Sequence, residues 1–219
     1  MRFNKLFLIL AFTLTLSVLV GYNTLISGWT HEDAGRFIQA NLDSLYLNKH
    51  DDVIELSETT EEEAIKAYYT GVDIEADFFA NYFEIDLELL PEAKEEIVSF
   101  LDKVYSYSNY EITETNDIGK DNFLVKVVVK PIDVIVQIIN DIDVIVSEYE
   151  AAFTEDISMS EKELETLWVD LILDCGYKKI PTVQYLDPVE HLVEIFLDED
   201  GYYTTTDSFY NIDEDIIAY

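Results

Sequence analysis

The chain has 219 residues, of which 46 are Asp or Glu and 13 are Lys or Arg, and its formal net charge is −33. This charge excludes the nucleic-acid-binding class, because phosphate binding needs a basic face. The single cysteine excludes an internal disulfide and any multi-cysteine metal site. A hydrophobic fraction of 49% is still enough for a packed core, so the acidity does not indicate disorder.

The first 28 residues have the composition of an export segment. Arg2 and Lys5 precede an apolar run from Leu6 to Val20, and the uncharged stretch continues to Ile26. A positive start and an apolar core are typical of a secretory signal, and a run of about twenty residues can also span a bilayer. Because the residues that follow are strongly acidic, we expect the amino end inside and the body outside the membrane. Residues 1–28 are therefore predicted as a signal peptide or signal anchor, which leaves an extracytoplasmic body that is membrane-anchored or secreted.

Residues 29–219 are predicted to form a single domain. They carry 11 basic and all 46 acidic residues. About 190 residues is an ordinary size for one domain, and no linker rich in Pro, Ser and Gly divides the stretch.

Capping-box patterns predict the starts of three helices in this body. In each, a hydroxyl residue precedes an acidic residue by three positions, so that each side chain can bond the other residue's backbone N–H. The three pairs are Thr30 with Asp33, Thr60 with Glu63, and Ser160 with Glu163.

The ends of these three helices are predicted from the residues that follow them. The first ends at His50-Asp51-Asp52. The second runs through Phe83, with Gly71 as a point where it could kink. The third closes at Cys175-Gly176, with the glycine in the left-handed capping conformation.

Two further helices are predicted between these. One starts after Pro91 and carries an apolar stripe from Ile97 to Val104. Residues 134–153 give two signals, because their β-branched runs favour strand whereas the spacing of their isoleucines favours helix. We predict one helix over this range, because twenty residues is too long for an ordinary strand.

The remaining segments predict two β-hairpins. Residues 107–115 and 123–130 are rich in β-branched and aromatic residues, and Asn116 to Gly119 reads as the turn between them. Pro131 stops the second strand and Asp133 caps the next element. Residues 189–197 and 202–206 form the second hairpin across Asp198 to Gly201, and a short tail helix reaches Tyr219.

This order predicts an α+β fold. Helices pack on a curved antiparallel sheet of about four strands in two hairpins, preceded by the N-terminal signal or anchor helix.

Several of these features together resemble a family of uncharacterised, acidic exported lipoproteins of Gram-positive bacteria. Leu19-Val20-Gly21-Tyr22 resembles a lipobox in which Tyr22 replaces the cysteine that would carry the lipid. The other matching segments are the helix with Phe37 and Leu45-Tyr46, the helix through Ala76-Asp77-Phe78-Phe79, and the junction from Val127 to Asp133. The resemblance implies export and, by analogy with small secreted domains, a cystatin-like or NTF2-like fold, but no activity.

Motifs for catalysis are missing from the sequence. It contains no G-x-S-x-G, no Walker or Rossmann glycine pattern and no H-E-x-x-H, and its three histidines are scattered. Cys175 follows an apolar helix stretch and is expected to be a small core residue. A carboxylate pair could serve a glycosidase, but 46 acids supply such pairs by chance. We therefore predict that the protein is not an enzyme and has no cofactor.

Calcium is the one cofactor for which the sequence gives a partial pattern. With Gly201 as position six of an EF-hand loop, Asp198, Asp200 and Asp207 occupy positions three, five and twelve. Phe196 at position one cannot coordinate, and the flanks read as strands. An acidic hairpin turn is therefore the favoured interpretation, with a calcium site as the alternative.

Tyrosines at a helix-to-strand junction and in the last predicted strand are candidate ligand-binding residues. Exposed tyrosines stack on sugars or hold protein partners, although strand tyrosines also pack in cores. The candidates are Tyr105, Tyr107, Tyr110, Tyr202 and Tyr203.

Three functions follow from the sequence. The favoured one is an exported, non-enzymatic binding or interaction module at the bacterial cell envelope. Its partner would be a small ligand, a glycan or a protein, held on a concave sheet face. The alternatives are an envelope-polymer hydrolase with a carboxylate pair and a calcium-dependent surface protein.

Overall fold

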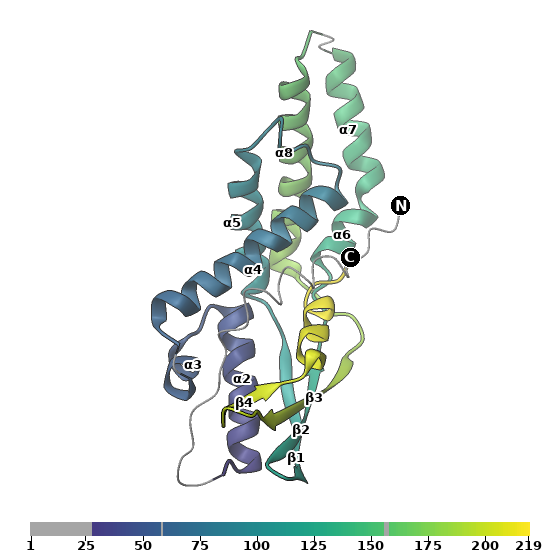
Figure 1. Ribbon diagram of the computed structural model, residues 1–219. Helices are drawn as coiled ribbons and strands as arrows, with labels where there is room; N and C mark the ends of the chain where they lie inside the picture. Colours follow the sequence, from purple (N-terminus) through teal and green to yellow (C-terminus); the bar gives the residue numbers. More distant parts are fainter. Residues whose placement is uncertain (1–27, 58, 156–157) are drawn as a thin grey trace.

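The computed structural model describes residues 28–219 except 58 and 156–157. The predicted signal or anchor segment therefore lies almost wholly outside the described residues. The described chain has a sheet half and a helical half, which meet at a waist crossed by α4 (Figure 1). The sheet half contains α2 (His31–Leu47), α3 (Asp51–Leu56), β1 (Tyr110–Gly119), β2 (Asn122–Val129), β3 (Val189–Leu197), β4 (Tyr203–Thr205) and the 3-10 helix η2 (Asp207–Asp215). The helical half contains α5 (Ala93–Tyr105), α6 (Val134–Asn140), α7 (Ile142–Glu155), α8 (Glu161–Lys179) and the short 3-10 helix η1 (Ile180–Thr182), and α4 spans Glu61–Tyr82.

The sheet confirms the predicted α+β class. Its four strands are antiparallel in the order β1-β2-β3-β4, so the two predicted hairpins lie side by side through the β2–β3 pair. β3 has the predicted bounds, and the β3–β4 turn falls at Asp198–Gly201, where Gly201 has a φ of 86°.

Alternation along β2 gives the sheet one buried face. Phe123, Val125, Val127 and Val129 are buried, whereas the residues between them are half-buried. α2 packs over β1 and β2, and η2 packs over β3, so these two helices cover the buried face. A strand side chain on this face therefore meets a helix and not solvent.

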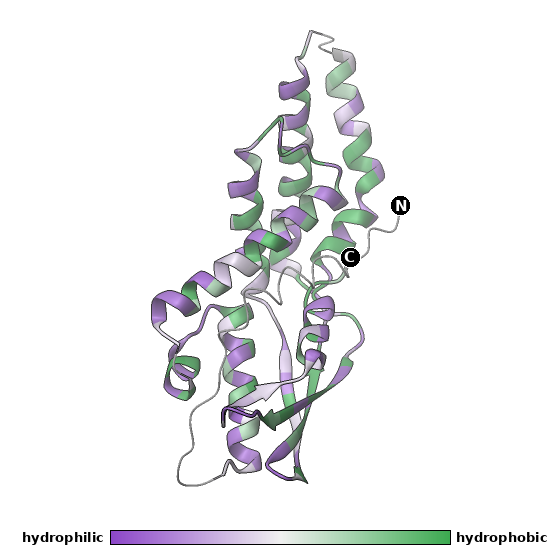
Figure 2. Cartoon of the chain, viewed as in Figure 1, coloured by the Kyte–Doolittle hydropathy of each residue, from purple (hydrophilic) through white to green (hydrophobic). Residues whose placement is uncertain are grey.

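The helical half packs around Gly176 of α8. A Cβ atom at this position would lie 2.6 Å from Cζ of Phe100 in α5 and 3.1 Å from Cδ1 of Ile138 in α6. Glycine therefore lets α8 approach both helices. α7 continues beyond α6 alongside α8, and the pair projects from the body as an arm (Figure 1). Figure 2 shows apolar residues along α6 and α7, and on α7 Val144 and Phe153 are exposed.

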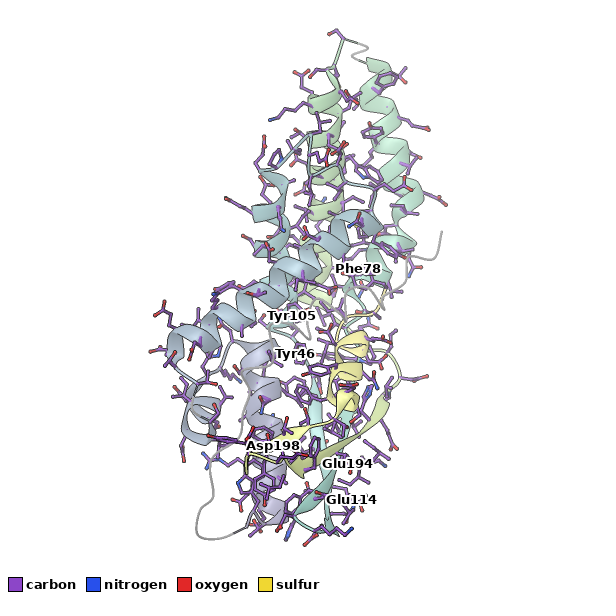
Figure 3. The ribbon with its side chains drawn as sticks, viewed as in Figure 1. Tyr46, Phe78, Tyr105, Glu114, Glu194 and Asp198 are labelled. Atoms are coloured by element: carbon purple, nitrogen blue, oxygen red, sulfur yellow. The ribbon has the colours of Figure 1, made fainter. Side chains whose placement is uncertain are left out.

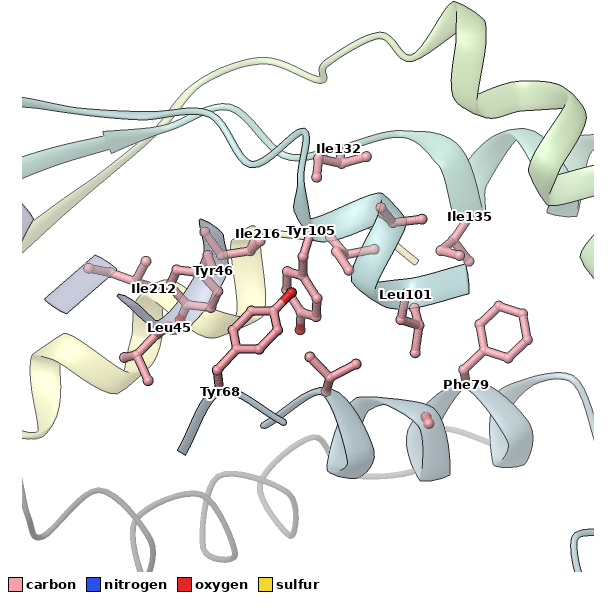
Figure 4. Close-up of a cluster of buried hydrophobic side chains, with 14 of the residues drawn as sticks. Leu45, Tyr46, Tyr68, Phe79, Leu101, Tyr105, Ile132, Ile135, Ile212 and Ile216 are labelled. Carbon is pink, nitrogen blue, oxygen red and sulfur yellow. The ribbon is translucent and has the colours of Figure 1, made fainter. Parts of the chain in front are cut away.

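The waist joins the halves through backbone pairing and a buried aromatic cluster. Ile132, after β2, forms bridges with Tyr185 and with Ile217. Beside it, Tyr46 of α2 stacks on Tyr105 of α5 with ring centroids 5.9 Å apart (Figure 4). The phenol of Tyr46 donates to Oδ1 of Asp213 in η2 at 3.3 Å, so residues from three distant segments close the core here.

The three predicted capping boxes are confirmed. Thr30, Thr60 and Ser160 each accept a bond from the backbone N–H of the acidic residue three positions on, and each acidic side chain accepts from the cap's backbone N–H. α4 runs through Gly71 as one helix. Asp133 does precede α6, but its side chain makes no capping bond to that helix; its Oδ1 accepts from Gln137 and from the backbone N–H of Gln184.

Four further local predictions are wrong. The first helix ends at Leu47, with Asn48 in the left-handed conformation, and residues 51–56 form the additional helix α3. The first hairpin turns at Lys120 and Asp121, both with a φ of 58°, and not at residues 116–119, which belong to β1. Positive φ at both central residues gives the turn that matches strand twist. Register shifts in β1 accompany the longer strand.

The other two errors lie in the helical half. Residues 134–153 form two helices and not one, because the chain turns at Asp141 and α7 then follows α8. α8 continues past Gly176 to Lys179, and Gly176 is a buried helix-interior residue, not a left-handed cap. In both places a tertiary contact decides the conformation.

Candidate functional site

A groove between α5 and α8 is the candidate site in the described part of the chain. It has a volume of about 460 Å³ and is widely open to solvent. Its lining comes from the end of the loop before α5, from α5 itself and from α8: Glu92, Glu95, Glu96, Ser99, Asp170, Leu173, Asp174 and Tyr177. Five of these eight side chains are carboxylates.

Helical spacing explains why these residues share the groove. On α5 the buried stripe contains Ile97, Phe100 and Leu101, so Glu95, Glu96 and Ser99 remain on the solvent side. On α8 the acidic residues Asp170 and Asp174 are four positions apart and therefore lie on one face. The close approach of the two helices at Gly176 brings both acidic faces together.

The groove is strongly negative. The Nζ atom of Lys162 lies 2.6 Å from Oε1 of Glu92 at one end, and this hydrogen bond lowers the pKa of the Glu92 carboxyl. No salt bridge between described residues neutralises the other four carboxylates. Such a lining attracts a cation and repels an anion.

Tyr177 adds an aromatic surface at the groove. Its ring contacts Phe100 edge-on, with centroids 5.2 Å apart, and 43% of the residue is exposed. Burial, and then the charge of Glu96, raise the pKa of its phenol, which therefore stays neutral at ordinary pH. Leu173 supplies an apolar floor. The groove can thus contact both a charged group and an apolar chain.

The predicted tyrosine site is distributed over the core and the surface. Tyr105 is buried in the waist, and burial raises the pKa of its phenol well above 10. Tyr110 is half-buried and donates to Oδ1 of Asp43 in α2 at 2.9 Å. Tyr107 is half-buried, and Nζ of Lys103 lies 5.6 Å from its ring centre. The sheet face on which Tyr110 lies is the face covered by α2, so it offers no open concavity here.

The two other predicted tyrosines lie at the opposite end of the sheet. Tyr203 is buried and stacks on Trp29 with ring centroids 4.0 Å apart. Tyr202 is half-buried beside the β3–β4 turn. The structure therefore does not bring the five predicted tyrosines together, and we do not include them in the candidate site.

The predicted calcium ligands lie in the β3–β4 turn and at the start of η2. Oδ1 of Asp198 accepts from the backbone N–H groups of Asp200 and Tyr202, so this carboxylate holds the β3–β4 turn (Figure 3). Asp207 begins η2. Within the described ranges no group of three or more His, Cys, Asp or Glu side chains has the spacing of a metal site.

A serine–histidine contact was not visible in the sequence. Oγ of Ser44 lies 2.9 Å from Nδ1 of His50, whose Nε2 lies 2.7 Å from Oδ1 of Asn48. These are the residue types of a nucleophile, a base and an orienting group. Ser44, however, is only 3% exposed, so a substrate cannot reach it. Asn48 is the left-handed residue that ends α2, and the contact therefore stabilises the α2–α3 turn.

Cys175 is half-buried in α8, as a small packing residue would be. Its Sγ lies 3.9 Å from Oδ2 of Asp141, which also accepts from Nζ of Lys179. Burial raises the pKa of the thiol, and this disfavours the reactive thiolate.

Comparison with known proteins shows a likeness of fold. No family model matches the chain, and no curated protein matches its sequence. A solved structure with a similar fold is that of ycdA from Bacillus subtilis, provisionally described as a lipoprotein. The match has a TM-score of 0.60 and 16% sequence identity, and it covers 85% of this chain and 56% of ycdA. The chain thus spans little more than half the length of ycdA, and at this identity the likeness establishes the fold alone.

The comparisons give no support to a cystatin-like or NTF2-like fold, and that part of the resemblance remains a prediction. None of the helices among the described residues is both long and apolar enough to cross a bilayer.

Proposed function

We propose that this chain is an exported, membrane-anchored binding protein of a Gram-positive cell envelope, that it is not an enzyme, and that it takes a small cationic ligand in the α5–α8 groove. Its predicted export segment supports the location, as does the fold that it shares with ycdA, a Gram-positive protein described as a lipoprotein. Tyr22 stands where a lipobox has cysteine, so the anchor is the apolar segment itself and not a lipid on that residue.

The groove is the observation that carries the binding proposal. Its volume of about 460 Å³ falls within the range of small-molecule sites. Five carboxylates around an apolar floor and a tyrosine suit a flexible polycation, whose ammonium groups pair with the acids while its methylene groups contact Leu173.

Exposure of the carboxylates favours binding over hydrolysis. A general acid in a glycosidase is normally a carboxyl group withdrawn from water. All five groove carboxylates belong to solvent-exposed residues. Exposed acids can attract a ligand but lack the dry surroundings that such chemistry uses.

The experiment is a calorimetric titration with spermine, a simple polycation. The groove variant combines Glu95→Gln, Glu96→Gln, Asp170→Asn and Asp174→Asn. The matched control also removes four negative charges, but from the sheet half, by Glu111→Gln, Glu114→Gln, Glu194→Gln and Glu199→Gln. Two of these residues, Glu114 and Glu194, are labelled in Figure 3.

We expect the groove variant to lose at least about tenfold in affinity, which corresponds to roughly 1.4 kcal/mol, because several charge pairs are lost together. The control should lose much less. Equal losses in both variants would show that spermine responds to the overall charge and would refute the groove as the site.

A further inference from the structure

The first described residues are fixed to one end of the sheet. The backbone N–H of Trp29 donates to the phenolic oxygen of Tyr203 at 3.1 Å, and the two rings stack. The Trp29 ring also contacts Phe37 of α2, with centroids 5.1 Å apart. A Cβ atom at Gly28 would lie 3.1 Å from Oδ1 of Asp121, in the β1–β2 turn. We refer to Gly28 and Trp29, with these contacts, as the docked stem.

The docked stem follows the predicted anchor at once. The uncharged stretch that can span the bilayer, Leu6 to Ile26, ends two residues before Gly28. Two residues of extended chain span at most about 7 Å. The predicted membrane-spanning stretch therefore ends within that distance of Gly28, which lies beside the β1–β2 turn. The contacts of Trp29 oppose free rotation of the body about a flexible linker.

The helical arm lies at the other end of the molecule. α2 begins beside the β1–β2 turn and runs to the waist, where Tyr46 meets Tyr105. α5, α7 and α8 lie beyond the waist, and the tip of the α7–α8 arm is farthest from the two hairpin turns (Figure 1). With 19 residues, α8 alone extends about 28 Å.

We infer that the body stands on the membrane by its hairpin turns, with the α7–α8 arm and the acidic groove directed away from the lipid. This inference rests on the membrane anchor of the proposed function. In this orientation the helical half faces away from the membrane, so a ligand that approaches from outside the cell reaches the groove before it reaches the sheet half.

Charge opposes the alternative in which the body lies flat. Residues 29–219 carry 46 acidic and 11 basic residues, and a membrane that contains anionic lipids has a negative surface potential. Laying a long side of this body against such a surface would bring many like charges together. A standing body places only its narrow end, with the two turns, near the headgroups.

Energy transfer from the protein to the membrane tests this orientation. Full-length protein is reconstituted into vesicles of phosphatidylglycerol and phosphatidylethanolamine that contain a lipid-bound acceptor dye. Cys175→Ser removes the native thiol. A donor is then attached through Glu199→Cys in the β3–β4 turn or, in the matched variant, through Thr154→Cys in the arm. Both positions are exposed.

We expect the efficiency of energy transfer to the lipid-bound acceptor to be several-fold higher for the donor at position 199 than for the donor at position 154. Trp29→Ala, which removes the stacked ring of the stem, should reduce this difference. Equal transfer at both positions, higher transfer at 154, or a difference unaffected by Trp29→Ala would overturn the inference. Protein that does not float with the vesicles would overturn the anchor itself, a failure that flotation detects separately from orientation.

Discussion

The two halves of the molecule use the same acidic composition in different ways. In the sheet half, acidic residues are spread along β1 and β3, and Nζ of Lys126 on β2 lies 2.8 Å from Oε2 of Glu190 on β3. In the helical half, five carboxylates face one another across a groove, and Lys162 pairs with one of them. The sheet half thus disperses its charge over a solvated surface, whereas the helical half concentrates it. Concentration, and not the total charge, distinguishes a candidate binding site.

The halves also differ in how completely they are packed. The two helices that cover the sheet, α2 and η2, bury their inner residues against its strands. The hydrophobic core of the sheet half continues into the waist. In the arm, α7 packs along α8, and among the α7 side chains that the structure describes only Ile145 is buried. Stability is therefore expected to be unequal, with the arm opening at a lower free energy than the sheet.

The largest expected effect comes from matched phenylalanine truncations in the two regions. Phe123→Ala in β2 removes a side chain that is 2% exposed and should lower the free energy of unfolding by about 3–5 kcal/mol. Phe153→Ala in α7, where the side chain is 45% exposed, should change it by less than about 0.5 kcal/mol. Urea denaturation measures both. Similar losses in the two variants would refute the contrast in packing.

A smaller loss is expected at the helix contact that builds the groove. Gly176→Ala places a methyl group 2.6 Å from the Phe100 ring, so it should destabilise the protein by about 1–3 kcal/mol, although alanine favours helix by about 1 kcal/mol. Phe100→Leu in the same chain should recover part of this loss, because the ring atoms are then gone. Thermal denaturation of the wild type, the two single variants and the double variant gives the coupling energy between positions 100 and 176. Strictly additive effects of the two substitutions would refute the steric explanation.

The smallest effect concerns acid pH and the first capping box. Hydrogen bonds from Thr30 hold the pKa of the Asp33 carboxyl below its usual value. A folded-state pKa below the unfolded one means that this carboxylate stabilises the fold above the unfolded pKa, and that the contribution is lost as pH falls through the folded value.

We therefore expect Asp33→Asn to lower the Tm at pH 6 and to lessen the fall in Tm between pH 6 and pH 3. Calorimetric scans across this range provide the measurement. A Tm difference between the two proteins that does not change with pH would contradict the assignment.

Local signals made much of the fold predictable. Each capping box lies within four residues of sequence, so Thr30, Thr60 and Ser160 mark helix starts without knowledge of the fold. The alternation in β3 and the Asp198–Gly201 turn are equally local. Together they were sufficient for the two hairpins and the α+β class.

Contacts between distant segments explain what the sequence did not reveal. Gly176 looks like a helix end, and it is an interior residue only because Phe100, 76 positions earlier, packs against it. The groove depends on the same contact. Asp170 and Asp174 have the spacing of an ordinary solvated helix face, and nothing local indicates that Glu95 and Glu96 lie opposite.

Native mass spectrometry of the protein, purified gently from its own host, tests most directly whether the helical half carries the binding site. The account predicts a small cationic molecule that stays with the wild-type protein and with the sheet-half control variant, and that is lost from the groove variant. A bound mass that persists in the groove variant, or a wild-type protein that carries none, would contradict it.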